Sequence, residues 1–380
     1  MKNIFIKIRN SIIGFLYRNI FKNIFFKIDP EITHDRAVQM GRILGSNIFF
    51  KKAVSFCLNF SDPALKQNIC GITFENPIGL AAGFDKNAEI IEIMPSVGFG
   101  FTEIGSITGQ SCLGNLKPRL WRLPKSKGLV VHYGLNNDGA EVISKRLIKK
   151  NQQINKIPLG INIAKTNSSD IVGIEKEIND YLKGIQAFLN IGDYLAINIS
   201  CPNAYGGQPF TDPDRLNLLF QEINKLNIKK PVFLKMAPDL SFEIVDKIIE
   251  LAEQYHISGF ICSNITKNRN NPKIILEEIN QVPVGIGGIS GKPSEEMTNN
   301  LITYVYKKTK GEKIIIGCGG IFSAEDAYKK IRLGSSLLQL ITGIIFEGPQ
   351  LISEINIGLC NLLKKDGFKN INEAIGIDFK

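Results

Sequence analysis

The stretch IIIGCGGIFSAEDAYKKIRLGSSLLQLITG, residues 314–343, decides the fold of this chain. It begins with a short apolar, β-branched run at 314–317, continues through an amphipathic segment at 324–333, and ends in a second apolar run at 337–341. Both apolar runs are continuous rather than alternating, as expected of parallel strands that are buried on both faces. The stretch therefore predicts one strand–helix–strand unit of a parallel sheet.

The same unit repeats along most of the chain from about residue 70. Amphipathic segments such as 243–255 separate most of the apolar runs. Eight units predict the α/β class and a (β/α)8 TIM barrel. A doubly wound sheet is the alternative, but it would have fewer units and a glycine-rich turn directly after its first strand. The eight runs lie at residues 78–82, 101–105, 159–164, 194–200, 232–236, 259–263, 314–317 and 337–341.

The length and the composition of the chain are those of an ordinary folded globular protein. The chain has 380 residues, enough for a barrel of about 250 residues with an added segment. Hydrophobic residues make up 44% and charged residues 22%, which excludes a disordered chain. None of the seven cysteines forms a C-x-x-C pair, and the chain has only three histidines. We therefore expect no protein-bound metal.

The first 28 residues are basic and apolar at once. They carry six of the ten net positive charges and no acid. The longest uncharged stretch in IFIKIRNSIIGFLYRNIFKNIFFKI (4–28) is eight residues, whereas a bilayer-spanning helix needs about 20. This pattern predicts an amphipathic helix lying in a membrane interface. A helix packed on the barrel with solvated cations is the alternative.

A second helix is expected at 32–50, because Pro30 and Glu31 are typical of a helix start. We accordingly predict two parts. Residues 1–60 form an amphipathic helical extension that associates with the membrane, and residues 61–380 form the barrel.

In TIM barrels the chemistry lies at the carboxyl ends of the strands. Carboxamides and lysines follow several predicted strands, with almost no acids. A carboxamide both donates and accepts, so a ring of them suits a flat heterocycle with alternating C=O and N–H edges. Glycines after the seventh and eighth strands suit a phosphate, although a glycine loop alone is usually just a tight turn. A further loop of small residues is expected at 285–291.

Eight motifs carry a family resemblance: NPIGLAAGFDK (76–86), EIGS (103–106), KPRLWRLP (117–124), GINIAK (160–165), NISCPN (198–203), KMAPDL (235–240), GISGKP (288–293) and IGCGGI (316–321). With these motifs the sequence resembles the quinone-using class of the dihydroorotate dehydrogenases, from about residue 30 to the C-terminus.

The resemblance implies that the chain oxidises dihydroorotate to orotate in de novo pyrimidine (UMP) biosynthesis, with FMN as hydride acceptor and a membrane quinone as electron acceptor. It implies peripheral attachment to the cytoplasmic face of the cell membrane, or to the mitochondrial inner membrane in a eukaryote, and no nucleic-acid partner. The FMN contacts implied by the motifs are Ala82, Gly83, Phe84, Asp85, Lys86, Ser106, Asn162, Asn198, Lys235, Ser263, Gly291, Gly320, Ile341 and Thr342. The substrate contacts so implied are Lys86, Asn198, Asn203 and Asn264, and those of the quinone channel are His34 and Arg122.

The motifs place Cys201 as the catalytic base. The alternative is that Cys201 is only a small buried hydrophobic residue without a catalytic role. A free thiol has a pKa of about 8.5, so we expect an accessible thiolate near neutral pH. Lys235 would offset the negative charge that develops on a reduced flavin.

The chain departs from the family pattern at four positions and in one loop. Cys201 stands where the quinone class usually has serine, and cysteine is the habit of the soluble class. Val131 replaces a substrate-binding asparagine, and His132 is a candidate to replace that polar contact. Ile265 replaces a threonine and Ile341 a tyrosine, and loop 204–210 also differs.

These departures leave two other functions open. One is an FMN-dependent ene-oxidoreductase that acts on a different unsaturated ring. The other is a tRNA-dihydrouridine synthase, whose motif also pairs Asn with Cys-Pro. Against the second function, the basic charge lies in the N-terminal arm and no basic helical domain follows the barrel.

Overall fold

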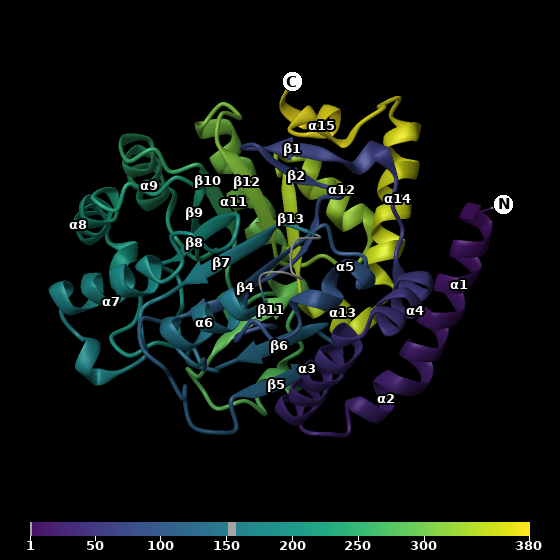
Figure 1. Cartoon of the computed structure of the whole chain (residues 1–380), viewed down its shortest axis with the longest axis horizontal. Coiled ribbons are helices and arrows are strands. Elements are labelled where there is room, and N and C mark those ends of the chain that lie inside the picture. Colours follow the sequence, from purple (N-terminus) through teal and green to yellow (C-terminus); the bar gives the residue numbers. More distant parts are fainter. Residues whose placement is uncertain (1, 151–156) are drawn as a thin grey trace.

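The computed structural model describes residues 2–150 and 157–380. Eight parallel strands form a closed barrel at its centre (Figure 1). Every predicted run overlaps one strand, and the bounds differ by at most two residues. The barrel prediction is therefore confirmed, and the doubly wound alternative is wrong. Around the barrel the strands are β3 (Ile78–Leu80), β4 (Phe101–Ile107), β7 (Leu159–Ile163), β8 (Tyr194–Asn198), β9 (Val232–Met236), β10 (Gly259–Cys262), β12 (Ile314–Cys318) and β13 (Leu337–Leu340).

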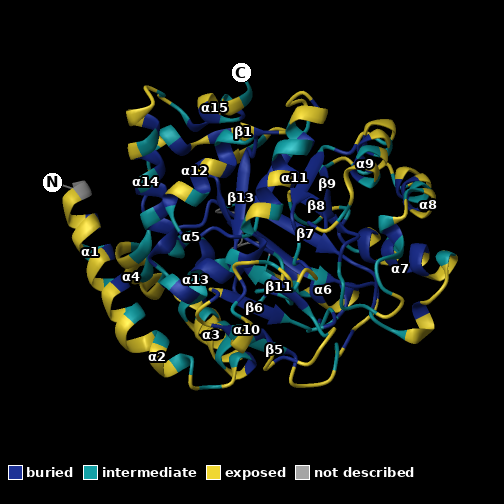
Figure 2. Ribbon diagram, turned by 180° about the vertical axis from the view of Figure 1, so that it is seen from behind, coloured by how far each residue is buried: buried dark blue, intermediate teal, exposed yellow. Residues whose placement is uncertain are grey.

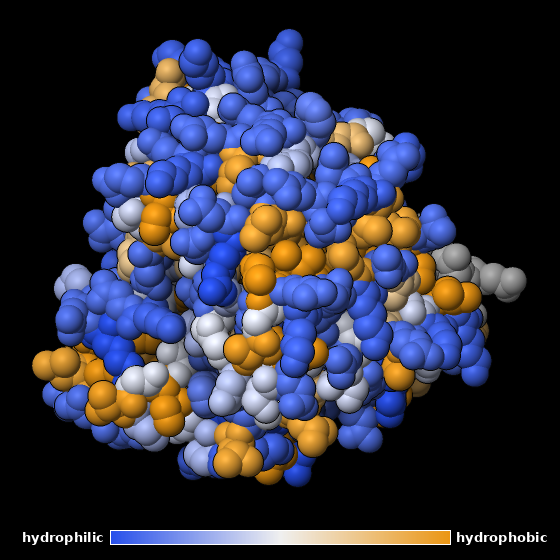
Figure 3. Space-filling model, turned by 90° about the vertical axis from the view of Figure 1, so that its left-hand side faces the viewer, coloured by the Kyte–Doolittle hydropathy of each residue, from blue (hydrophilic) through white to orange (hydrophobic). Residues whose placement is uncertain are grey.

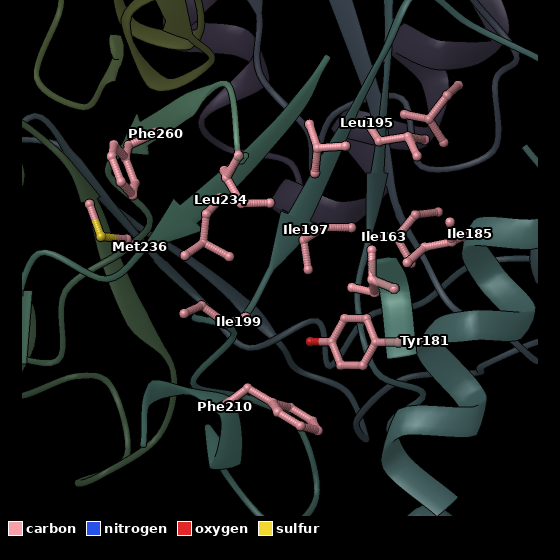
Figure 4. Close-up of a cluster of buried hydrophobic side chains, with 14 of the residues drawn as sticks. Ile163, Tyr181, Ile185, Leu195, Ile197, Ile199, Phe210, Leu234, Met236 and Phe260 are labelled. Atoms are coloured by element: carbon pink, nitrogen blue, oxygen red, sulfur yellow. The ribbon is translucent and has the colours of Figure 1, made fainter. Parts of the chain in front are cut away.

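Helices surround the barrel and bury its outward-facing side chains. In Figure 4, Ile163 and Ile197 of the strands lie beside Tyr181 and Ile185 of α7, within one core cluster. Burying such side chains stabilises the fold by roughly 1.5–3 kcal/mol each. The longer helices are α6 (Ala140–Lys150), α7 (Ile174–Gln186), α8 (Pro213–Asn224), α9 (Phe242–Gln254), α11 (Glu295–Lys308), α12 (Ala324–Arg332) and α14 (Leu351–Lys365). The shorter ones are α5 (Met94–Val97), α10 (Leu276–Ile279), α13 (Thr342–Glu347) and α15 (Ile371–Ala374).

A hairpin closes the amino end of the barrel. It consists of the antiparallel strands β1 (Gln67–Ile69) and β2 (Ile72–Phe74). Its Phe74 packs edge-on against Phe101, the first residue of β4, at a ring-centroid distance of 5.4 Å. Because this end is filled with apolar side chains, a ligand can enter only at the carboxyl ends of the strands.

A second sheet of three antiparallel strands was not predicted. It contains β5 (Leu120–Leu123), β6 (Gly128–Val131) and β11 (Gly288–Gly291), with β6 in the middle. The prediction of a loop over 285–291 is therefore wrong for its last four residues, which pair with β6. The partner strand lies about 160 residues earlier in the chain, so local sequence could not indicate the pairing.

The N-terminal residues form helices on one side of the barrel. They are α1 (Lys2–Leu16), a π-helical turn η1 (Tyr17–Phe21), α2 (Lys22–Phe25), α3 (Pro30–Ser46) and α4 (Ile48–Leu58). The single helix expected at 32–50 is wrong, because Asn47 is extended and its side chain caps α4 by accepting from the Phe49 amide. None of the described helices is long and apolar enough to cross a bilayer. The domain boundary at residue 60 stays a prediction.

Candidate active site

One cavity of about 650 Å³ begins at the carboxyl ends of the barrel strands and continues beneath α3 and α4. Its inner end is polar and its outer end is apolar. It is lined by all of the predicted site residues except Asp85 and Asn162. The structure thus brings together side chains from the barrel, the second sheet and the N-terminal helices.

The two exceptions lie just behind the cavity wall. The Asp85 carboxylate is buried and accepts hydrogen bonds from the backbone amides of Glu89 and Ile90, so it holds the turn after β3. Asn162 is fully buried, and its Oδ1 accepts from the Ser106 hydroxyl, which does line the cavity. The FMN contacts expected of Asp85 and Asn162 stay predictions.

Three side chains form a linked polar wall at the inner end. Asn198 Nδ2 donates to Ser106 Oγ at 2.9 Å, and Asn264 Nδ2 lies 3.3 Å from Asn198 Oδ1. Asn264 Nδ2 also donates to the Ser200 carbonyl at 3.1 Å. These bonds fix the orientation of the carboxamides, so their remaining donors and acceptors can read the edges of a flat ring.

Two lysines bring positive charge to this cavity. Lys235 is 4% exposed, and its Nζ lies 3.9 Å from Glu103 Oε1 without a hydrogen bond to any described residue. Lys86 Nζ lies 4.0 Å from the centre of the Tyr133 ring and 3.4 Å from His34 Nε2. Burial lowers the pKa of Lys86 to about 8. An ammonium with free donors suits an anionic or carbonyl-bearing ligand.

Cys201 lines the same cavity, but its thiol is harder to ionise than the sequence suggested. Burial raises its pKa to about 11, although a backbone hydrogen bond from Asn203 and the charges of Lys165 and Lys267 act in the opposite direction. The expectation of an accessible thiolate near neutral pH is therefore wrong, because desolvation penalises the charged form. At pH 7 the thiol is protonated in the resting protein.

Glycines at and just after the ends of β11 and β12 form part of the cavity wall. Gly291 and Gly320 have positive φ angles of 90° and 73°. A Cβ on Gly291 would clash with the Lys127 carbonyl, and one on Gly320 would clash with Glu295 Cβ. The backbone is therefore bare here, next to the hydroxyl pair of Ser290 and Thr342, which are 2.9 Å apart. Backbone N–H groups that no side chain covers, together with hydroxyl groups, can bind a phosphate. The residues therefore fit the phosphate-bearing flavin that the motifs imply.

The outer end of the cavity is lined by apolar side chains of the N-terminal helices. Its polar residues are held by their own contacts. Arg122 Nη1 donates to the Ile28 carbonyl at 2.7 Å, and its guanidinium lies 4.8 Å from the centre of the Phe26 ring. His34 Nε2 lies 2.9 Å from the Phe84 carbonyl oxygen. Both residues line the cavity, and their role in a quinone channel stays a prediction. The apolar lining includes Phe25, Phe26, Ala37, Met40, Leu44, Val54 and Leu58.

The four single positions that depart from the family pattern lie at the cavity. Val131, Ile265 and Ile341 line the cavity. His132 does not line it, and its Nδ1 lies 3.3 Å from Asn203 Oδ1. The His132 side chain therefore contacts Asn203 but does not reach the cavity. It does not replace the polar group that is absent at Val131.

Sequence reasoning missed Tyr133. It lines the cavity beside Lys86, and its buried hydroxyl has no hydrogen-bond partner among the described residues. Its position within the divergent loop 131–135 was the only available signal.

Comparison with known proteins identifies the class. The family model described as dihydroorotate dehydrogenase matches residues 64–363. The chain belongs to the dihydroorotate dehydrogenase family, and it is an oxidoreductase acting on CH–CH bonds.

Similar curated proteins are named dihydroorotate dehydrogenase (quinone). The protein from Trichodesmium erythraeum is 37% identical, with 95% of this chain and 98% of that protein covered. The one from Crocosphaera subtropica is 42% identical, with 93% and 95% covered. These comparisons favour neither of the two alternative functions.

The crystal structure of the Eimeria tenella enzyme in complex with ferulenol has a TM-score of 0.81 and 32% identity, and covers 93% of this chain and 96% of that one. The ligand-free type of the same enzyme has a TM-score of 0.82 with 93% and 100% covered.

Proposed function

We propose that the chain oxidises dihydroorotate to orotate with FMN bound at the carboxyl ends of the barrel strands, and that a quinone in the apolar end of the same cavity takes up the electrons. The observation that carries this proposal is the continuity of the cavity. It joins a wall of carboxamides and lysines to an apolar chamber under α3 and α4. A polar substrate and an apolar oxidant can therefore reach one cofactor from different directions.

The residues of this chain have separate tasks in the reaction. Cys201 takes the proton from the substrate carbon next to a carbonyl, which requires its thiolate form. Asn198 and Asn264, held by the bonds described above, orient the pyrimidine edge. Lys235 places a positive charge where negative charge develops during flavin reduction. A bound flavin would supply the chemistry that these residues lack, namely acceptance of the hydride from the adjacent carbon and transfer of two electrons to a quinone.

Gly291, Gly320 and Thr342 would hold the FMN phosphate with backbone amides and a hydroxyl. Lys235, Ser106 and Asn198 would meet the flavin ring. Lys86, Asn198, Asn203 and Asn264 would meet the substrate. Support for these roles comes from the shared cavity wall and from the sequence motifs.

We further propose that the protein lies on a membrane surface through α1 to α4. Each of these helices exposes large apolar side chains, for example Phe15 on α1 and Phe49 on α4, which is 75% exposed. Figure 2 shows exposed residues along the outer side of α1 and α2. On the opposite side of the molecule, hydrophilic side chains cover most of the surface apart from separate apolar patches (Figure 3). Apolar side chains beside lysines suit a bilayer interface with anionic headgroups.

The function is tested with the purified protein under anaerobic conditions. Dihydroorotate should bleach the flavin absorbance, and a quinone should restore it faster than fumarate or NAD does. Bleaching by a different unsaturated ring compound, but not by dihydroorotate, would overturn the substrate assignment. Restoration by fumarate or NAD alone would overturn the quinone assignment.

A further inference from the structure

Glu103 is a buried carboxylate that the proposed mechanism does not use. It lies on β4 inside the barrel, with no exposed surface. Its oxygens accept hydrogen bonds from three other strands: Asn162 Nδ2 at 2.8 Å, the Tyr194 hydroxyl at 3.0 Å and Gln339 Nε2 at 2.7 Å. All three groups donate to the carboxylate oxygens, and the Lys235 ammonium lies on the side of Oε1. This set of donors suits a carboxylate anion.

The only positive charge in contact with this anion is the ammonium of Lys235, among the ion pairs of the described residues. Its Nζ lies 3.9 Å from Glu103 Oε1, beyond hydrogen-bond distance, while the same ammonium lines the cavity. Both side chains are buried, so their interaction is weakly screened by solvent. A ligand in the cavity therefore meets a positive charge that has a negative charge directly behind it.

The same carboxylate is linked to the predicted flavin contacts by hydrogen bonds. Glu103 holds Asn162, and Asn162 Oδ1 accepts from the Ser106 hydroxyl in the cavity wall. Any change of charge at Glu103 is thus felt at the polar wall as well as at Lys235.

We propose that Glu103 is a positioning residue that lowers the reduction potential of the bound flavin by partly neutralising Lys235; this inference rests on the proposed FMN site. Two-electron reduction of a flavin places negative charge on its ring, which an ammonium stabilises and a carboxylate behind it destabilises. A lower potential keeps the reduced cofactor able to give both electrons to a quinone. The electrons enter from the substrate and leave to the quinone, so Glu103 changes the balance between the two half-reactions and not their stoichiometry.

Glu103→Gln tests this with little change of shape. The new amide needs an acceptor on the side of Tyr194 and Gln339. The Tyr194 hydroxyl can turn, and Gln339 can rotate its Oε1, which has no partner among the described residues, toward the new donor. The potential of the bound flavin is measured by reducing the holoprotein together with a reference dye of known potential.

We expect a more positive potential in Glu103→Gln, with the equilibrium constant for reduction raised about tenfold, which is about 30 mV for a two-electron couple. Glu103→Asp keeps the negative charge but withdraws it from Lys235 by one methylene, so it should shift the potential in the same direction by less. This variant serves if Glu103→Gln does not fold. Tyr194→Phe is the matched control, because it removes a hydrogen bond to the same carboxylate without changing the charge, and it should leave the potential unchanged.

An unchanged or more negative potential in the folded Glu103 variants would overturn the proposal, as would an equal shift in Tyr194→Phe. Its failure is distinguishable from failure of the proposed function. If the proposed function fails, the wild-type protein binds no FMN. If only the role of Glu103 fails, the wild-type protein is yellow and the potential of its flavin does not respond to substitution of Glu103.

Discussion

Asn10 Nδ2 donates a 2.9 Å hydrogen bond to Ser353 Oγ and so joins α1 to α14 across 343 positions of the chain. Arg9 adds a bond from its Nη1 to the Phe56 carbonyl of α4. One face of the N-terminal helix is therefore fixed to α14 and α4 by polar contacts, while its other face leaves apolar side chains exposed. The packed-helix alternative thus describes one face of α1, and the membrane interface stays a prediction for the other face.

The first prediction concerns this attachment. Asn10→Ala removes the bond to Ser353, and the free energy of unfolding should fall by about 1 kcal/mol. The change is measured as a lower midpoint in denaturant or heat. Asn19→Ala is the control, because the Asn19 side chain is exposed and donates only to the Phe15 carbonyl of its own helical segment. Equal losses in both variants would contradict a specific role of the Asn10 bond.

The second prediction concerns the membrane surface. Phe15 on α1 and Ile148 on α6 are both 61% exposed. Phe15→Asp should weaken binding to anionic vesicles about tenfold, since burying such a side chain is worth roughly 1.5–3 kcal/mol. Ile148→Asp should leave the binding unchanged. Co-sedimentation at several lipid concentrations separates the two variants, and similar behaviour of both would exclude α1 as the contact.

The third prediction concerns the apolar end of the cavity. Tyr17, Phe25 and Phe26 line it, so deleting residues 1–28 opens the chamber to water. Reoxidation by long-chain quinones should slow much more than flavin reduction by dihydroorotate, which uses the inner end. Rapid-mixing measurements of each half-reaction test this separately. A deletion variant that uses long-chain quinones normally would show that the arm has no part in quinone access.

The fourth prediction concerns the base. Cys201→Ala should slow flavin reduction by about 10²–10⁴-fold, because general-base catalysis is lost while FMN stays bound. Cys112→Ala is the matched control, since Cys112 is a buried thiol that does not line the cavity. Nearly full activity of Cys201→Ala would assign the proton to another group.

The fifth prediction concerns pH. The pKa of Cys201 is raised to about 11, and the thiolate is the active form. At saturating substrate, flavin reduction should therefore accelerate about tenfold per pH unit from neutral pH toward 10. The pKa of Lys86 is lowered to about 8, so its positive charge is lost above that pH and the anionic substrate should bind more weakly. Rates measured over a range of substrate concentrations separate the two effects, and a maximal rate that is flat between pH 7 and 10 would contradict the thiolate mechanism.

Local sequence was sufficient to predict the barrel. Strands buried on both faces need continuous apolar runs, and parallel pairing needs a helix between them, so the pattern of 314–343 repeats wherever a unit occurs. The polar residues that follow the barrel strands were predictable for the same reason, because the carboxyl ends of all barrel strands meet at one face. Gly291, His34 and Arg122 lie outside the barrel strands and were indicated only by the family motifs. The start of the second helix was predicted nearly correctly from Pro30 and Glu31, but its end was not, since Asn47 caps the next helix instead of continuing the first.

Only the tertiary structure decided the features that depend on distant partners. Gly288–Gly291 forms a strand because Gly128–Val131 lies alongside it. Nothing in the local sequence of either segment indicates that it pairs with the other. Glu103 and Lys235 became an ion pair because β4 and β9 face the same barrel interior. The thiol pKa of Cys201 is set by how much water its neighbours exclude, and desolvation is a property of the folded surroundings that no residue type contains by itself.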